Sequence, residues 1–99
     1  MIAHLVLFRF KPGIAPDSEA AHALHAQMLA LPAQISEIRD WRCGFNTTPD
    51  ADAEDYALYA TFETRDALHR YFEHPAHLRL VESISPLVDL KFVDIGSVD

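Results

Sequence analysis

Residues 71–78 read Tyr71-Phe72-Glu73-His74-Pro75-Ala76-His77-Leu78 and set two histidines and a tyrosine close together. Pro75 interrupts a helical pattern at this point, because proline lacks the backbone N–H that a helix interior needs. Proline is nevertheless favoured at the first position of a helix, and His74 then stands at the capping position before it. The stretch therefore predicts a junction between two helical segments that also concentrates titratable side chains.

Apolar spacing extends the helical pattern to both sides of this junction. Thr64 is the expected cap of the helix before it, and Pro86 marks the end of the helix after it. The apolar stripes are Leu68, Tyr71 and Phe72 before the junction, and Leu78, Val81, Ile84 and Leu87 after it.

Another helix is predicted nearer the N-terminus. Asp17 or Ser18 is its expected cap, and Pro32 closes it. Its apolar stripe consists of Ala21, Leu24, Met28 and Leu31. His22 and His25 lie off this stripe, so we expect both of them to be exposed to solvent.

Four strand-like segments accompany the helices. Ile2–Phe10 is almost continuously apolar, which is typical of a strand buried on both faces. Ile38–Asn46 and Tyr56–Phe62 show strand-like alternation, and Val88–Ile95 is the last strand. The order is βαββαβ, which predicts an α+β chain of the ferredoxin-like type.

One face of this sheet is expected to stay uncovered, since the helices can cover only the other. The first strand is apolar on both faces, and Tyr59 and Val93 add apolar character to the second face. A large exposed apolar face in a soluble protein marks an interface. We therefore expect a homodimer in which two sheets pack face to face about a two-fold axis.

Length and charge narrow the class of protein. The chain has 99 residues, which predicts a single domain over residues 1–99. Its net charge of −7 and the lack of a basic stripe argue against nucleic acid and against an anionic membrane surface as partners. The sequence begins with no leader-like segment and has no long apolar run, so we expect a cytoplasmic protein. Cys43 is the single cysteine and is interpreted as a small buried apolar residue.

Two stretches resemble a known family. His4-Leu5-Val6-Leu7-Phe8-Arg9-Phe10-Lys11-Pro12-Gly13 is similar to the start of the stress-responsive A/B barrel (Dabb) family. The same holds for Ala60-Thr61-Phe62-Glu63-Thr64-Arg65-Asp66-Ala67-Leu68, which leads into Tyr71 and His74-Pro75-Ala76-His77. The resemblance covers essentially the whole chain.

This resemblance implies a dimeric α+β barrel, in which two ferredoxin-like protomers curl their sheets around a shared interior. A plant member of the family performs a cofactor-free aldol cyclisation of a linear polyketide. Its catalytic tyrosine and histidine match Tyr71 and His77, and its early-strand histidine matches His4. A further histidine in the third strand of that enzyme has no counterpart in Tyr56–Phe62.

The residue types support acid–base chemistry without a cofactor. His77 is suited to take a proton from carbon next to a carbonyl near neutral pH, and Tyr71 to donate a hydrogen bond to the oxygen that becomes charged. His4 would orient or polarise the ligand. We expect this site to take a small, partly apolar molecule and to act as a lyase or cyclase.

Other interpretations of the same residues stay open. In a non-catalytic, stress-associated or structural dimer, the histidines would only fix the helix junction, and Tyr71 would pack in the core. A cofactor-free monooxygenase is a third class, because that group shares the dimeric barrel architecture. A metal site at His74 and His77 is disfavoured, since zinc wants a third ligand in fixed geometry and Pro75 disturbs helical spacing. No metal ligands are therefore assigned.

Overall fold

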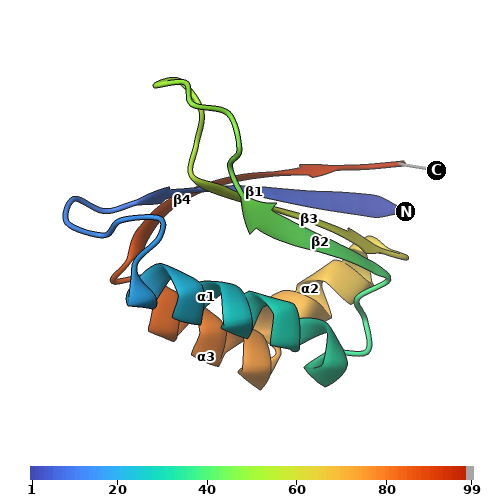
Figure 1. Ribbon diagram of the computed structural model, residues 1–99. Helices are drawn as coiled ribbons and strands as arrows, with labels where there is room; N and C mark the ends of the chain where they lie inside the picture. The colour runs from blue at the N-terminus through green and yellow to red at the C-terminus, as the bar shows by residue number, and fades with distance from the viewer. Residues whose placement is uncertain (98–99) are drawn as a thin grey trace.

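An antiparallel sheet and the helices on one of its faces make up residues 1–97, which the computed structural model describes (Figure 1). The elements in chain order are β1 (Ile2–Phe10), α1 (Glu19–Ala30), the 3-10 turn η1 (Leu31–Gln34), β2 (Asp40–Phe45), β3 (Tyr56–Phe62), α2 (Arg65–Glu73), α3 (Pro75–Ile84) and β4 (Val88–Ile95). The strand order is β2-β3-β1-β4. This is the ferredoxin-like α+β fold that the sequence predicts, with its second helical part divided at Pro75.

The predicted helix caps are confirmed. The side chains of Ser18 and Thr64 accept hydrogen bonds from backbone amides in the first turns of α1 and α2. At α3, Nδ1 of His74 accepts from the amide of Ala76 at 3.0 Å, and Pro75 follows it directly. The prediction that Pro32 closes the first helix is confirmed, since α1 ends at Ala30. Pro32 itself lies in the 3-10 turn η1 that follows, because the first turn of a helix tolerates proline.

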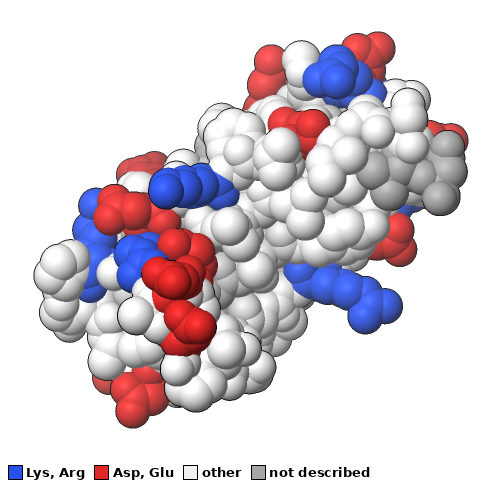
Figure 2. Space-filling model, turned by 90° about the horizontal axis from the view of Figure 1, so that it is seen from above, with Lys and Arg blue, Asp and Glu red and all other residues white. Residues whose placement is uncertain are grey.

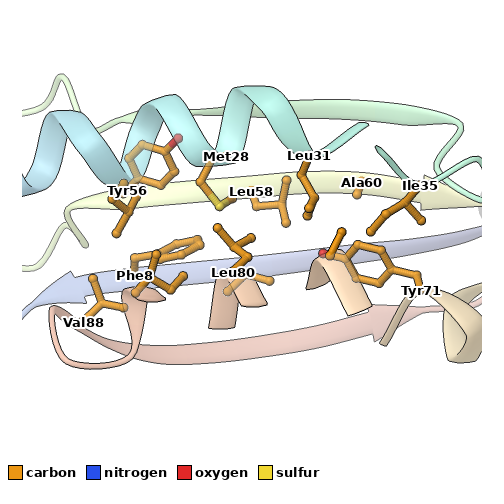
Figure 3. Close-up of a cluster of buried hydrophobic side chains, with 14 of the residues drawn as sticks. Phe8, Met28, Leu31, Ile35, Tyr56, Leu58, Ala60, Tyr71, Leu80 and Val88 are labelled. Atoms are coloured by element: carbon orange, nitrogen blue, oxygen red, sulfur yellow. The ribbon is translucent and has the colours of Figure 1, made fainter. Parts of the chain in front are cut away.

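The core lies between the helices and the sheet. Figure 3 shows side chains from both layers meeting there, with Tyr56 toward one end and Tyr71 toward the other. Large side chains that are fully buried include Phe62, Leu24, Met28 and Leu68. Burying such a side chain contributes about 1.5–3 kcal/mol, so this layer holds the helices against the sheet.

The predicted stripe of α3 is partly wrong. Leu78 is 55% exposed and Val81 is 37% exposed, whereas Ala76, Leu80 and Ile84 are buried. These three buried residues are spaced four apart, starting in the first turn of α3. The helix is therefore rotated about its axis relative to the predicted stripe, so that this row faces the sheet. Leu78 and Val81 consequently lie toward solvent.

The opposite face of the sheet carries no helix. Its exposed apolar side chains include Leu7 on β1 and Val93 and Ile95 on β4. Figure 2 looks onto this outer face, where uncharged residues form a broad band between charged groups. The segment 46–55 between β2 and β3 rises on the same side (Figure 1), and its base is held by an ion pair of 2.9 Å between Arg9 and Glu54.

Within residues 1–97, no helix combines the length and the apolar character that crossing a membrane requires.

Candidate functional site

A cavity of about 300 Å³ lies between the helices and the sheet. His4, Tyr71 and His77 all line it, so the three residues predicted as a site lie around one space. The other lining side chains are apolar and come from β1, β3, β4 and all three α-helices; they include Val6, Leu58, Met28, Phe72, Leu80 and Phe92. The cavity is therefore an apolar space with its polar groups supplied by three side chains.

Three different elements carry these polar side chains. His4 stands near the start of β1, Tyr71 in the last turn of α2 and His77 in the first turn of α3. The break at His74 and Pro75 turns the chain so that the rings of Tyr71 and His77 have centroids 4.5 Å apart. The ring of His4 is 5.9 Å from that of Tyr71. The helix junction and the sheet together assemble the cluster.

The environment of His77 favours its neutral form. Its Nδ1 lies 3.0 Å from the carbonyl oxygen of Phe72, and since a carbonyl can only accept, Nδ1 carries the proton. Burial lowers the pKa of the His77 imidazole, and the nearby rings of His4 and His74 lower it further. The Phe72 bond opposes this shift without reversing it. At neutral pH, Nε2 therefore keeps a free lone pair and can act as a base.

Tyr71 is placed as a hydrogen-bond donor. Its side chain is buried, and burial raises the pKa of its phenol well above the ordinary value. The phenol stays protonated across the physiological pH range. Its hydroxyl makes no hydrogen bond to another residue within the described part of the chain. The proton is thus available to a ligand in the cavity.

His4 is paired with an acid that the sequence analysis missed. Its Nδ1 lies 2.6 Å from Oδ1 of Asp94, which stands directly opposite on β4. With the carboxylate as acceptor, Nδ1 carries the proton and Nε2 of neutral His4 is left as an acceptor. The sequence pattern does indicate that Asp94 faces the helices, because it continues the alternation of Val88, Leu90 and Phe92 along the last strand. An acid on an apolar face calls for a partner.

His74 belongs to the helix junction. Its Nδ1 caps α3, as the sequence predicts for this position. Within residues 1–97, no group of three or more His, Cys, Asp or Glu side chains is arranged to hold a metal ion.

A second polar pair, formed by half-buried His25 and buried Tyr56, lies at the edge of the core toward the other end of the sheet. Nδ1 of His25 is 2.6 Å from the hydroxyl of buried Tyr56, and the ring of His25 packs edge-on against Phe45. The predicted exposure of His25 is therefore wrong, because its side of α1 faces the end of β3. His22 is exposed as expected, and Cys43 is half-buried.

Comparison with known proteins places this geometry in context. The family model described as Stress responsive A/B Barrel Domain matches residues 2–98. An uncharacterized protein of Streptomyces coelicolor, SCO4036, is 40% identical over 77 residues, which are 78% of this chain and 79% of that protein.

Solved structures of similar fold include proteins of known and unknown function. A dimeric ferredoxin-like protein of unknown function from Thermobifida fusca has a TM-score of 0.84 and 27% identity, covering 95% of this chain and 88% of its own. A hydroxynitrile lyase from Passiflora edulis has a TM-score of 0.78 and 19% identity, covering 99% and 95%. At that identity the likeness to the lyase is one of fold.

Proposed function

This chain belongs to the stress-responsive A/B barrel domain family, and we propose that it binds a small, largely apolar carbonyl compound and performs cofactor-free acid–base chemistry on it. The observation that carries this proposal is the convergence of His77, Tyr71 and His4 on one apolar cavity. A base with a free lone pair and a protonated phenol are the two groups that enolate chemistry needs.

The reaction begins with proton transfer to His77. Nε2 takes a proton from the carbon next to the carbonyl, so that the C–H bond breaks and an N–H bond forms. The electron pair moves into the carbonyl and creates an enolate, and the Tyr71 hydroxyl donates a hydrogen bond to the oxygen that becomes negative. Return of the proton from His77 to carbon completes an exchange. In an aldol cyclisation, the enolate carbon instead attacks a second carbonyl of the ligand: the C–C bond forms as the carbonyl π bond breaks, and the alkoxide produced takes the proton from His77.

The pair of His4 and Asp94 is proposed to position the reacting group. The 2.6 Å bond fixes the orientation of the His4 ring at the wall of the cavity. A ring held in this way loses little freedom when a ligand binds, which favours a productive geometry.

A lyase-type reaction fits the same groups. A base can take the proton of a hydroxyl, whose oxygen then forms a carbonyl as the adjacent carbon–carbon bond breaks. The carbon group that leaves with the electron pair of that bond takes the proton back from the base. The hydroxynitrile lyase from Passiflora edulis shares the fold, and it supports the view that this scaffold can house a lyase.

The test is proton exchange at carbon. Methyl hexyl ketone in deuterium oxide should exchange the hydrogens next to its carbonyl faster with the protein than without it, as followed by NMR. His77→Ala should abolish the acceleration while the thermal unfolding midpoint changes little. Two results together would favour the non-catalytic role of the histidines. The wild-type protein would not accelerate exchange, and His77→Ala would lower the free energy of unfolding by about 1 kcal/mol or more.

We also propose that two copies associate through the outer face of the sheet. Leu7, Val93 and Ile95 are 46%, 55% and 47% exposed on that face. An apolar surface of this kind is usually an interface, and the similar protein from Thermobifida fusca is described as dimeric. Sedimentation at micromolar concentration should give the mass of a dimer, and a monomer there would refute this assembly.

A further inference from the structure

We infer that the cavity selects a neutral compound with one polar end and an unbranched apolar tail, and that this compound enters between α3 and β4. The inference rests on the proposed function, because it specifies the ligand of the same cavity. It is carried by three observations: the layering of the lining residues, the absence of charged side chains among them, and the exposure of the residues at one side.

The lining residues of β1 and their partners on β4 form layers along the strands, and of these partners Asp94 does not itself line the cavity. In the register of β1 and β4, His4 stands opposite Asp94, Val6 opposite Phe92, and Phe8 opposite Leu90. These are a polar layer, a middle apolar layer and a far apolar layer. Phe8 lies four positions after His4, which at a rise of about 3.3 Å per residue makes the cavity wall about 13 Å long.

The helix α3 runs along the same layers. It starts at the polar end, where His77 lies beside Tyr71. It ends near the far layer, because the amide of Lys11 donates to the carbonyl of Leu87 at 2.8 Å just after α3. Ile84, in the last turn, lines the cavity there. A ligand therefore meets hydrogen-bonding groups at one end only.

Charge is excluded from the lining. No Lys, Arg, Asp or Glu among residues 1–97 lines the cavity, and its His77 is held neutral. A carboxylate, a phosphate or a carrier thioester with charged groups would lose its water here without gaining a partner, which is costly. Carbonyls spaced along the tail would likewise leave oxygens unpaired in the apolar layers, so a second carbonyl for an aldol step has to lie beside the first at the polar end. One neutral polar end fits best.

The way into the cavity follows from exposure. At the polar end, His4 and Tyr71 are 4% and 2% exposed and His77 is half-buried, so little of this end faces solvent. Val81 on α3 and Leu90 and Phe92 on β4 line the cavity and yet are 37%, 42% and 66% exposed. The opening is thus an apolar seam between α3 and β4. Phe92 stands over it with its ring centroid 5.8 Å from that of His4.

A homologous series tests the tail. Methyl ketones from methyl ethyl ketone to methyl decyl ketone are titrated into the whole chain by calorimetry, beside fatty acids of matching length. The affinity of the ketones should rise roughly three- to fourfold per methylene and stop rising when the tail fills the cavity. Each fatty acid should bind at least tenfold more weakly at pH 8. Equal binding of acids and ketones, or no dependence on length, would overturn the inference.

A pair of variants tests the seam. Phe92→Ala should weaken the best ketone at least fivefold, because the ring closes the middle layer. Leu78→Ala removes a side chain of similar exposure on α3 that does not line the cavity, and it should leave binding unchanged. Equal effects of the two variants would contradict the seam. Both positions are exposed, so both variants should fold, and thermal unfolding verifies it.

The binding experiments test the ligand class, and the proton-exchange experiment tests the reaction, so the two proposals can fail independently. Length-dependent ketone binding without proton exchange would support this ligand class and refute the acid–base proposal. Proton exchange on a carboxylate ligand that binds as tightly as the ketones would support the acid–base proposal and refute this ligand class.

Discussion

The rings of Tyr71 and His77 lie 4.5 Å apart across the break between α2 and α3. Neither ring reaches this position through a loop: Tyr71 is in the last turn of one helix and His77 in the first turn of the next. The two groups of the proposed reaction are therefore held by regular backbone, which gives the precise placement that acid–base catalysis needs.

His77→Gln separates basicity from packing. The glutamine amide can still donate to the carbonyl of Phe72, but it has no basic lone pair. Proton exchange on a ketone should fall by roughly two to four orders of magnitude, the range of a lost general base. NMR exchange rates and a thermal melt of the same sample provide the measurement. Retention of the wild-type rate would remove His77 from the mechanism.

His77 is expected to make the folded protein less stable in mild acid. Its native pKa is lowered from the ordinary value of 6.5, so in acid the unfolded chain binds this proton more readily than the folded one. Stability is therefore lost as pH falls below 6.5. Urea unfolding between pH 8 and pH 5, compared for wild type and His77→Gln, should show a smaller loss in the variant. An equal loss in both would contradict the assignment.

Tyr71→Phe keeps the buried ring and removes only the hydroxyl. That hydroxyl bonds to no other residue within 1–97, so stability should change by less than about 0.5 kcal/mol. Turnover should fall roughly a hundredfold, as when one donor to a developing oxyanion is lost. Calorimetric melting and the exchange assay distinguish the two effects. A large loss of stability with no change in turnover would make Tyr71 a packing residue.

Asp94→Asn weakens the bond that holds the His4 ring. Replacing the carboxylate by an amide should reduce ketone exchange and cost about 1–3 kcal/mol of stability, because His4 is buried and loses its charged acceptor. Asp89→Asn on the same strand is the matched control, since the Asp89 side chain is 69% exposed and pairs only at the surface with Lys11. Similar effects of both changes would show that the His4 pair has no special role.

Val93→Asp tests the outer face. A charge in the centre of an apolar interface should convert the dimer to monomer in sedimentation at micromolar concentration. Leu29→Asp places the same charge on an equally exposed apolar position of α1, away from the sheet, and should leave the dimer intact. Dimers in both variants would place the interface elsewhere.

The sequence predicts those features that depend on local chemistry. Thr64 and His74 cap helices as expected, and the βαββαβ order and the last strand, Val88–Ile95, are confirmed. The gathering of His4 with Tyr71 and His77 follows from the family likeness, whereas spacing along the chain says nothing about how a strand and a helix are apposed.

What the sequence analysis missed depends on register and rotation. Asp94 meets His4 because β1 and β4 pair in one register out of several that the apolar pattern allows. His25 reaches Tyr56 because of the rotation of α1 on the sheet, and Leu80 replaces Leu78 in the core for the same kind of reason. Tertiary packing selects among such options, and local propensity does not.

The bond between His4 and Asp94 joins residues 90 positions apart in the sequence. A fragment of this domain without β4 therefore has no Asp94 to hold the ring of His4, and it also lacks Leu90 and Phe92 of the cavity wall. The cavity cannot be complete before β1 and β4 have paired. Its formation depends on one of the longest-range pairings in the domain, so we expect it to accompany the folding of the whole domain rather than of any local segment.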